Sequence, residues 1–148
     1  MVKKLILVVE DNTIIALDIS RRLKQFGYRV IPYLVVSGEV AIEKAEILHP
    51  DLVLMDIKLK GKIDGIQAAE IISNRFGIPF IYITAHSDNF TRQRAERTNP
   101  AGYLIKPFQE TKLQQILDKV LNPRPQVKKG LIGINPGYPT NPNPVRFP

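Results

Sequence analysis

Continuous apolar runs that alternate with amphipathic segments constrain the fold of this 148-residue chain more than any other feature. Residues 5–9 (Leu-Ile-Leu-Val-Val) and 52–55 (Leu-Val-Leu-Met) are uninterrupted apolar runs, which is typical of strands buried on both faces. The runs that we expect to be strands are 5–9, 28–33, 52–55, 80–83 and 103–105. A helical pattern follows each of them, and this alternation predicts a parallel sheet with right-handed crossovers and helices on both faces.

The segments between the runs carry helix signals. Ile15, Ile19 and Leu23 recur at helical spacing, Asn12 is a suitable N-cap, and Gly27 is placed to end that helix. The segments that we expect to be helices are 13–26, 38–48, 66–76, 89–98 and 110–121. The helix at 89–98 is poor in apolar residues, so its packing is expected to be the weakest of the five.

The charge of the chain is unevenly distributed. Of the formal net charge of +7, residues 1–121 carry +3 and residues 122–148 carry +4 without any acid. The segment 122–148 also holds seven of the twelve prolines, so we expect an irregular tail or linker with no fold of its own. Its four scattered bases are more typical of a solubilising tail than of a nucleic-acid site, and 27 Pro-rich residues are too few for a helix-turn-helix unit.

Composition excludes several classes of function. The chain has no Cys, which excludes a disulfide framework, a thiolate zinc site and a Cys nucleophile. No apolar run approaches the roughly 20 residues of a membrane helix, and the basic, apolar N-terminus is followed at once by acids, as in a first strand rather than a signal peptide. We therefore expect a cytoplasmic protein without a membrane partner.

The candidate chemistry lies where the predicted strands end. In an open parallel sheet, ligands bind outside the carboxyl ends of the strands. Those ends carry Glu10 and Asp11, Asp56, Thr84, and Lys106. Three carboxylates repel one another unless a cation joins them, and hard oxygen ligands favour Mg²⁺ or Mn²⁺. With a hydroxyl and an ammonium nearby, this set suits phosphoryl transfer, in which a carboxylate can be the nucleophile.

The same residues carry a resemblance to a known family. The acidic pair Glu10-Asp11, the strand-ending Leu54-Met55-Asp56, the step Thr84-Ala85 and the dipeptide Lys106-Pro107 stand in the order and spacing of the receiver domain of two-component response regulators. The resemblance covers residues 3–121, so we divide the chain into a receiver domain at 1–121 and the tail at 122–148. It implies a CheY-like, flavodoxin-like doubly wound α/β fold with five parallel strands in the order 2-1-3-4-5 and five flanking helices.

The resemblance also implies roles for individual residues. Asp56 resembles the phosphoacceptor, and Glu10, Asp11 and Asp56 would hold Mg²⁺ together with the backbone carbonyl of Lys58. Lys106 would pair with the phosphoryl oxygens, across a cis peptide bond to Pro107.

A second group of residues would change conformation when Asp56 is phosphorylated, or would affect how long the phosphoryl group stays. Thr84 would move to hydrogen-bond the phosphate, and Tyr103 would turn inward into the space that Thr84 leaves. His86 and Lys58 lie near the expected phosphoryl position, and we predict that both modulate the lifetime of the phosphorylated state. His49 and His86 lack metal-ligand spacing.

Rival phosphate-handling folds fit less well. A haloacid-dehalogenase-type phosphatase needs a second Asp two residues after the nucleophile, where this chain has Lys58. A P-loop needs a Gly-rich loop that ends in Lys-Ser or Lys-Thr, and none is present. In a flavin- or dinucleotide-binding domain, Glu10 and Asp11 would repel the phosphate.

We expect the domain to function in signalling and not to turn over a substrate. The resemblance implies a phosphoacceptor in a His-Asp phosphorelay, with a histidine kinase or a His-containing phosphotransfer protein as donor. A downstream protein or a second copy would read the face formed by 89–98, 103–105 and 110–121. Two alternatives stay open: a receiver module of a larger hybrid sensor kinase, and a scaffold that works without phosphorylation.

Overall fold

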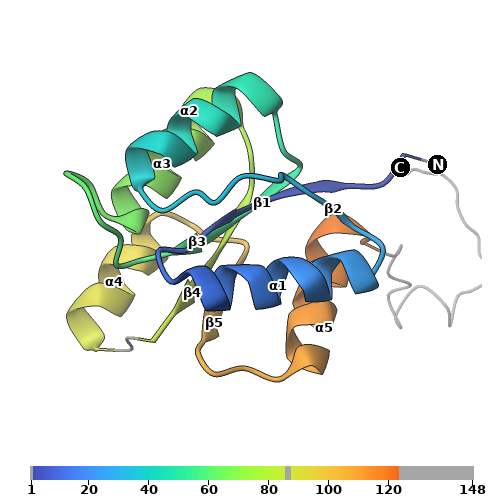
Figure 1. Cartoon of the computed structure of the whole chain (residues 1–148). Coiled ribbons are helices and arrows are strands. Elements are labelled where there is room, and N and C mark those ends of the chain that lie inside the picture. The colour runs from blue at the N-terminus through green and yellow to red at the C-terminus, as the bar shows by residue number, and fades with distance from the viewer. Residues whose placement is uncertain (1, 86–87, 124–148) are drawn as a thin grey trace, which may run out of the picture.

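The structure is a computed structural model that describes residues 2–85 and 88–123 (Figure 1). Strands and helices alternate along the chain, as the apolar runs predict. The elements are β1 (Leu5–Val9), α1 (Thr13–Gln25), β2 (Arg29–Val30), α2 (Gly38–Leu48), β3 (Leu52–Asp56), α3 (Gly65–Phe76), β4 (Phe80–Thr84), α4 (Asn89–Arg97), β5 (Gly102–Ile105) and α5 (Glu110–Leu121). His86 and the tail from residue 124 onward lie outside the described residues.

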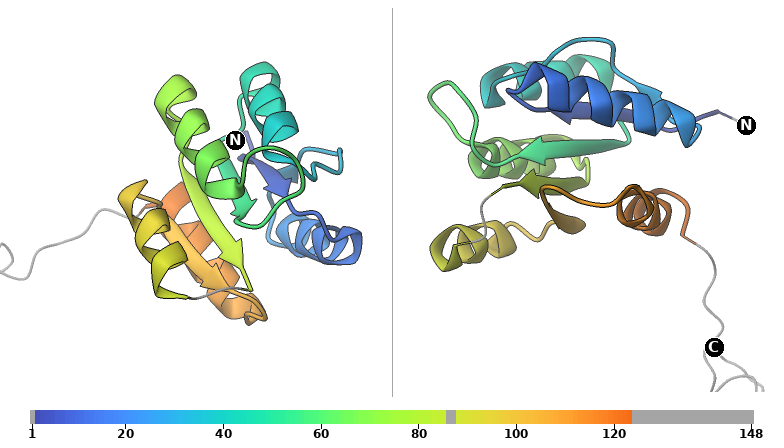
Figure 2. Two further views of the ribbon diagram at one scale, coloured as in Figure 1. Left: turned by 90° about the vertical axis from the view of Figure 1, so that its left-hand side faces the viewer. Right: turned by 60° about the horizontal axis from the view of Figure 1, so that its bottom comes forward.

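The five strands form one parallel sheet in the order β2-β1-β3-β4-β5, which confirms the predicted fold class and strand order. Two apolar clusters cover its two faces. One face packs against α2, α3 and α4, and the other packs against α1 and α5 (Figures 1 and 2). The central strands β1, β3 and β4 are almost fully buried, which explains why their sequences are continuous apolar runs and not alternating ones.

The second strand is shorter than the sequence predicts. It covers only residues 29–30 instead of 28–33. Pro32 has no backbone N–H to donate to a ladder, and Tyr33 and Leu34 are exposed, so the chain leaves the sheet there. It returns at Val35, which forms an isolated bridge with Val9 and accepts a hydrogen bond from the backbone N–H of Glu10 at 3.0 Å.

The predicted helix limits hold to within one residue. Asn12 caps α1 by accepting from the N–H of Ile15 at 3.1 Å, and Gly27 follows the end of that helix with φ +97°. Asp64 begins α3 with a reciprocal capping box to Gln67. No helix within residues 2–85 and 88–123 has the length and apolar character needed to cross a membrane.

Candidate functional site

Three carboxylates meet at the carboxyl edge of the sheet. β1 delivers Glu10 and Asp11, and the neighbouring β3 ends at Asp56. One carboxylate oxygen of each residue lies within 4.8 Å of the others. Glu10 and Asp56 are 1% and 5% exposed, whereas Asp11 is half-buried. The three line a cavity of about 280 Å³ together with Asn12, Ile15, Lys58, Ala85 and Lys106.

Lys106 reaches this cluster from the end of β5. Its Nζ donates to Glu10 Oε1 at 2.7 Å and to Asp56 Oδ2 at 3.4 Å. The backbone N–H of Lys106 donates to the carbonyl of Thr84 at 2.8 Å, which fixes the root of the side chain beside β4. The Lys106–Pro107 peptide bond is cis, as the family resemblance implies. The two distances show that the Lys106 ammonium lies closer to Glu10 than to Asp56, and both of these carboxylates are buried.

Burial and the unequal contacts with Lys106 together separate the pKa values of the two carboxyls. Burial raises the pKa of Asp56 to about 7, and the nearby charge of Glu10 adds to this, while the more distant Lys106 opposes it only partly. Burial also acts to raise the pKa of Glu10, but the hydrogen bonds from Lys106 and from the backbone N–H of Asn12 outweigh it and hold that pKa below its ordinary value. Glu10 is thus the permanently charged member of the pair, and Asp56 is the one whose charge depends on what binds.

The two carboxylates in turn raise the pKa of Lys106. Burial alone would lower the pKa of Lys106, but its hydrogen bond to Glu10 and the charges of Asp56 and Glu10 raise it above the ordinary value. The side chain is therefore a permanent cation at neutral pH. It supplies a fixed positive charge beside Asp56.

The donor set of the cavity fits a hard divalent cation. It offers oxygen ligands from three carboxylates on one side, and the described residues of the cluster contain no sulfur or imidazole donor. Lys58 lines the same cavity and lies two residues after Asp56, which agrees with its predicted place. The sequence therefore brings Glu10, Asp11, Asp56, Lys58 and Lys106 together as expected.

The two predicted switch residues lie on the neighbouring strands β4 and β5. Thr84 ends β4 and is fully buried. Tyr103 lies on β5, half-buried, with its ring centroid 6.1 Å from that of Tyr82. Arg92 of α4 lies over the face of the Tyr103 ring, with Cζ 4.3 Å from the centroid.

Two features of the site were missed by sequence reasoning. Gly65 packs so closely on β3 that a Cβ atom there would overlap the carbonyl oxygen of Asp56. Arg94 pairs with Asp64 at 2.9 Å, next to that glycine. The Asp64-Gly65 dipeptide is visible in the sequence, but its contact with Asp56 depends on how the loop at 57–64 folds back.

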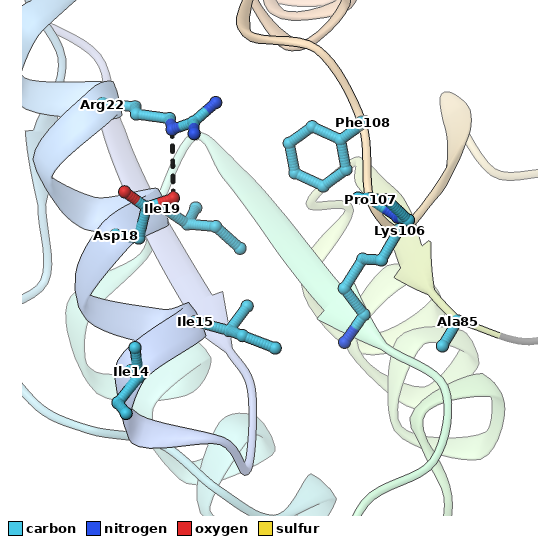
Figure 3. A pocket seen from close by; sticks show the side chains of 9 residues that line it. All are labelled: Ile14, Ile15, Asp18, Ile19, Arg22, Ala85, Lys106, Pro107 and Phe108. Carbon is cyan, nitrogen blue, oxygen red and sulfur yellow. Dashed lines mark ion pairs between the residues drawn. The ribbon is translucent and has the colours of Figure 1, made fainter.

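A second, larger cavity of about 610 Å³ opens beside the acidic cluster (Figure 3). Figure 3 shows Ile14, Ile15 and Ile19 of α1 on one side and Pro107 and Phe108 on the other. The Asp18–Arg22 ion pair of α1 lies at its rim. Lys106 lines both cavities, so the charged and the apolar cavity share one wall.

Comparison with known proteins identifies the family of the chain. The family model described as the response regulator receiver domain matches residues 6–118. The transcriptional regulatory protein PdtaR of Mycobacterium tuberculosis is 36% identical over 107 residues, which are 72% of this chain and 51% of that protein. The phyllosphere-induced regulator PhyR of Methylorubrum extorquens is 31% identical over 116 residues, 78% of this chain and 43% of that protein. The chain thus matches only about half the length of these curated relatives.

Solved structures show the same fold. The signal receiver domain of a modulated diguanylate cyclase from Desulfovibrio desulfuricans has a TM-score of 0.76 and 35% identity, over 81% of this chain and 94% of that one. The receiver domain of the sensor histidine kinase PA1611 from Pseudomonas aeruginosa, which has a magnesium ion coordinated in its active-site cleft, has a TM-score of 0.71 and 34% identity, over 80% and 98%. With the family model covering most of the chain, this protein belongs to the response regulator receiver domain family of two-component systems.

Proposed function

We propose that Asp56 accepts a phosphoryl group from the phosphohistidine of a partner kinase or phosphotransfer protein. A carboxylate oxygen of Asp56 attacks phosphorus, the P–N bond breaks, and the donor imidazole leaves with the bonding electrons. The observation that carries this proposal is the cluster of Glu10, Asp11 and Asp56 within 4.8 Å, with the Lys106 ammonium against it. Phosphoryl transfer depends mainly on positioning and charge neutralisation, which are what such a cluster supplies.

Glu10, Asp11 and Asp56, together with the backbone carbonyl of Lys58, would hold Mg²⁺, and Mn²⁺ would serve in its place. When bound, the cation neutralises charge that builds up between the carboxylates and the phosphoryl oxygens. The three side chains offer hard oxygen donors that lie within 4.8 Å of one another. The related receiver domain of PA1611 holds Mg²⁺ in its active-site cleft. Glu10 stays ionised because Lys106 stabilises its charge, so it would be a ligand throughout.

Lys106 and Thr84 would bind the product. The Lys106 ammonium is already paired with Asp56 Oδ2 and would turn to the phosphoryl oxygens, while retaining Glu10 as a partner. The Thr84 hydroxyl would donate to a phosphoryl oxygen, and Tyr103 would turn inward. The face of α4, β5 and α5 would then present a changed surface to a downstream protein or to a second copy of the chain.

Phosphorylation at Asp56 is tested by incubating the full chain with acetyl phosphate and Mg²⁺ and measuring its intact mass. We expect an adduct of about 80 Da, the mass of a phosphoryl group, on the wild type. The adduct should disappear with excess EDTA and in Asp56→Asn. It should persist in the control Asp51→Asn, because Asp51 lies at the opposite end of β3, where its Oδ2 accepts from the N–H of Leu5 at 2.7 Å. Absence of any adduct on the wild type would support the scaffold alternative instead.

Lys58 and His86 are proposed to modulate the lifetime of the aspartyl phosphate by controlling the approach of the attacking water. Lys58 lines the acidic cavity, and His86 lies outside the described residues. Lys58→Ala and His86→Ala should each change the dephosphorylation rate by several-fold, measured as the decay of the mass adduct after the donor is removed. Lys60→Ala is the matched control, since Lys60 does not line the cavity. Unchanged decay in both variants would contradict this role.

The place of the domain in its pathway is also a proposal. We infer a receiver domain at 1–121 that transfers and stores a phosphoryl group without substrate turnover, in the cytoplasm and without direct contact to nucleic acid. Membership in a hybrid sensor kinase remains the second candidate, because one similar structure is a receiver domain of a sensor histidine kinase. Kinase-to-receiver transfer assays with purified candidate kinases, stand-alone and hybrid, would separate the two.

A further inference from the structure

Helix α4 has few apolar anchors. Of its nine residues only Ala95 is buried, and its one large apolar side chain, Phe90, is 72% exposed. The other helices each bury three or more residues. Apolar burial alone therefore holds α4 weakly, and polar contacts must contribute more to its position than they do elsewhere in the fold.

Arg94 provides the first such contact. Its Nη2 lies 2.9 Å from Asp64 Oδ2, and the two side chains are 32% and 30% exposed. The other oxygen of Asp64 accepts from the N–H of Gln67, so the carboxylate is fixed as the N-cap of α3. This rigid anchor gives the ion pair a defined geometry, which an ion pair between two flexible surface side chains lacks.

Asp64 is joined closely to the acidic cluster. The next residue, Gly65, donates its N–H to the carbonyl of Ile57 at 2.7 Å and packs directly against the backbone carbonyl of Asp56. A displacement of the Asp56 backbone would therefore be transmitted to the N-terminus of α3 and to the partner of Arg94. The contact between α3 and α4 is thus one step away from the candidate phosphoacceptor.

Arg92 provides the second contact, on the other flank of the helix. Its guanidinium carbon lies 4.3 Å from the centre of the Tyr103 ring, a cation–π geometry. At about 100° per residue, Arg92 and Arg94 point about 160° apart around α4, with Ala95 on the arc between them. One arginine therefore reaches β5 while the other reaches α3, on either side of the buried Ala95.

We propose that Arg92 and Arg94, here called the α4 arginine pair, are positioning residues that hold α4 in its unphosphorylated place. This inference rests on the proposed function, because it concerns how easily the Asp56 switch operates. An inward turn of Tyr103 removes the ring from beneath Arg92, and a shift of α4 separates Arg94 from Asp64. Each contact stabilises the present arrangement, so each lowers the population of the switched arrangement.

Population linkage gives the expected effect. If the phosphoryl-like ligand binds only the switched arrangement, its apparent affinity is proportional to the population of that arrangement. Loss of one half-exposed ion pair or cation–π contact should therefore tighten apparent binding about two- to fivefold. The effect is opposite in sign to that of general damage to the fold, which would weaken binding.

The Arg94 contact is tested by titrating the full chain with beryllium trifluoride, a phosphoryl mimic, at saturating Mg²⁺, with the apparent dissociation constant measured by calorimetry. Arg94→Gln and Asp64→Asn should each tighten binding. The double variant should bind no more tightly than either single variant, because both substitutions remove the same ion pair. The asparagine side chain in Asp64→Asn keeps an oxygen that can cap α3, so the helix N-terminus is retained. Arg94→Lys should restore wild-type affinity. Arg97→Gln is the control, since Arg97 is exposed on the same helix and forms no ion pair with any residue that the structure describes.

The Arg92 contact is tested in the same titration. Arg92→Gln should tighten binding in the wild type and have no effect in a Tyr103→Leu background, where the ring is absent. Thermal unfolding of every variant verifies that it is folded at the temperature used.

The outcomes separate the two proposals. If the wild type binds beryllium trifluoride no better than Asp56→Asn, the proposed function is wrong. If the wild type binds normally but Arg94→Gln behaves like Arg97→Gln or binds more weakly, the role of the arginine pair is wrong while the proposed function stands. Tightening in Arg94→Gln without tightening in Asp64→Asn would also overturn it, because the effect would not pass through the ion pair.

Discussion

Asp56→Asn should raise the free energy of unfolding of the Mg²⁺-free protein at pH 8 by about 2–4 kcal/mol, although it removes the candidate phosphoacceptor. Burial raises the pKa of Asp56 to about 7 in the folded protein, against 3.8 for an unperturbed Asp, and the charge of Glu10 adds to this. Each pKa unit corresponds to about 1.4 kcal/mol, so ionised Asp56 costs the fold up to about 4 kcal/mol. Asparagine has nearly the same shape and carries no charge.

The sign of the pH dependence follows from the raised pKa. Above pH 7, Asp56 is ionised in both the folded and the unfolded protein, and the full cost is present. Between about pH 7 and pH 4 the folded protein takes up a proton that the unfolded chain does not, so the wild type gains stability as the pH falls. Below about pH 4 both states are protonated at this position, and Asp56 contributes no further change.

Urea unfolding from pH 8 to pH 5 in EDTA measures this effect. The difference in stability between Asp56→Asn and the wild type should be largest at pH 8 and should shrink toward pH 5. Asp51→Asn, at the other end of β3, should parallel the wild type. Saturating Mg²⁺ should stabilise the wild type at pH 8 more than it stabilises Asp56→Asn. A wild type that is as stable as Asp56→Asn at pH 8 in EDTA would contradict the electrostatic account of the site.

Gly65→Ala should be the most damaging single-methyl substitution in the domain. The added Cβ would overlap the carbonyl oxygen of Asp56 and crowd the backbone of Ile57. Backbone atoms of a buried central strand cannot move aside as a side chain can, so we expect a loss of at least about 3 kcal/mol of stability. The acetyl phosphate adduct should also decrease, because the clash displaces the strand end that carries Asp56.

Gly102→Ala is the matched control for this substitution. Its Cβ would meet Cδ1 of Ile116, the far end of a flexible side chain that can change rotamer. The expected loss is about 1 kcal/mol, measured by urea unfolding alongside Gly65→Ala. Equal losses in the two variants would mean that the contact with the Asp56 backbone has no special cost.

The sequence predicted the sheet and most of the acidic site because both depend on local patterns. Buried parallel strands must be apolar along their whole length, so their ends are easily located, and the carboxyl ends of neighbouring strands meet by topology. Glu10, Asp56 and Lys106 come together for this reason. The roles assigned to them, to Thr84 and to Tyr103 stay predictions until phosphorylation and its effects are measured.

What the sequence could not predict depends on contacts between distant segments. The second strand shortened because Pro32 ends the ladder, although the run 28–33 remains β-favourable. The ion pair of Arg94 with Asp64 and the contact of Arg92 with the Tyr103 ring depend on where side chains of α4 point. The sequence of α4 has no apolar stripe from which these directions could be predicted. The contrast between the pKa values of Glu10 and Asp56 depends on tertiary contacts: burial and the charge of Glu10 raise the pKa of Asp56, while Lys106 and the backbone N–H of Asn12 hold that of Glu10 low. Lys106 lies 2.7 Å from Glu10 but 3.4 Å from Asp56.

The short β2 strand has a consequence for how the protein behaves at high concentration. The open edge of a sheet exposes unpaired N–H and C=O groups, to which another chain can add in register and start aggregation. Here the edge strand β2 covers only two residues, and Pro32, which lacks a backbone N–H, follows soon after it. Another chain therefore has very little extended backbone with which to pair. On the opposite edge, β5 covers four residues and ends just before Lys106 and Pro107, which limits strand addition in the same way.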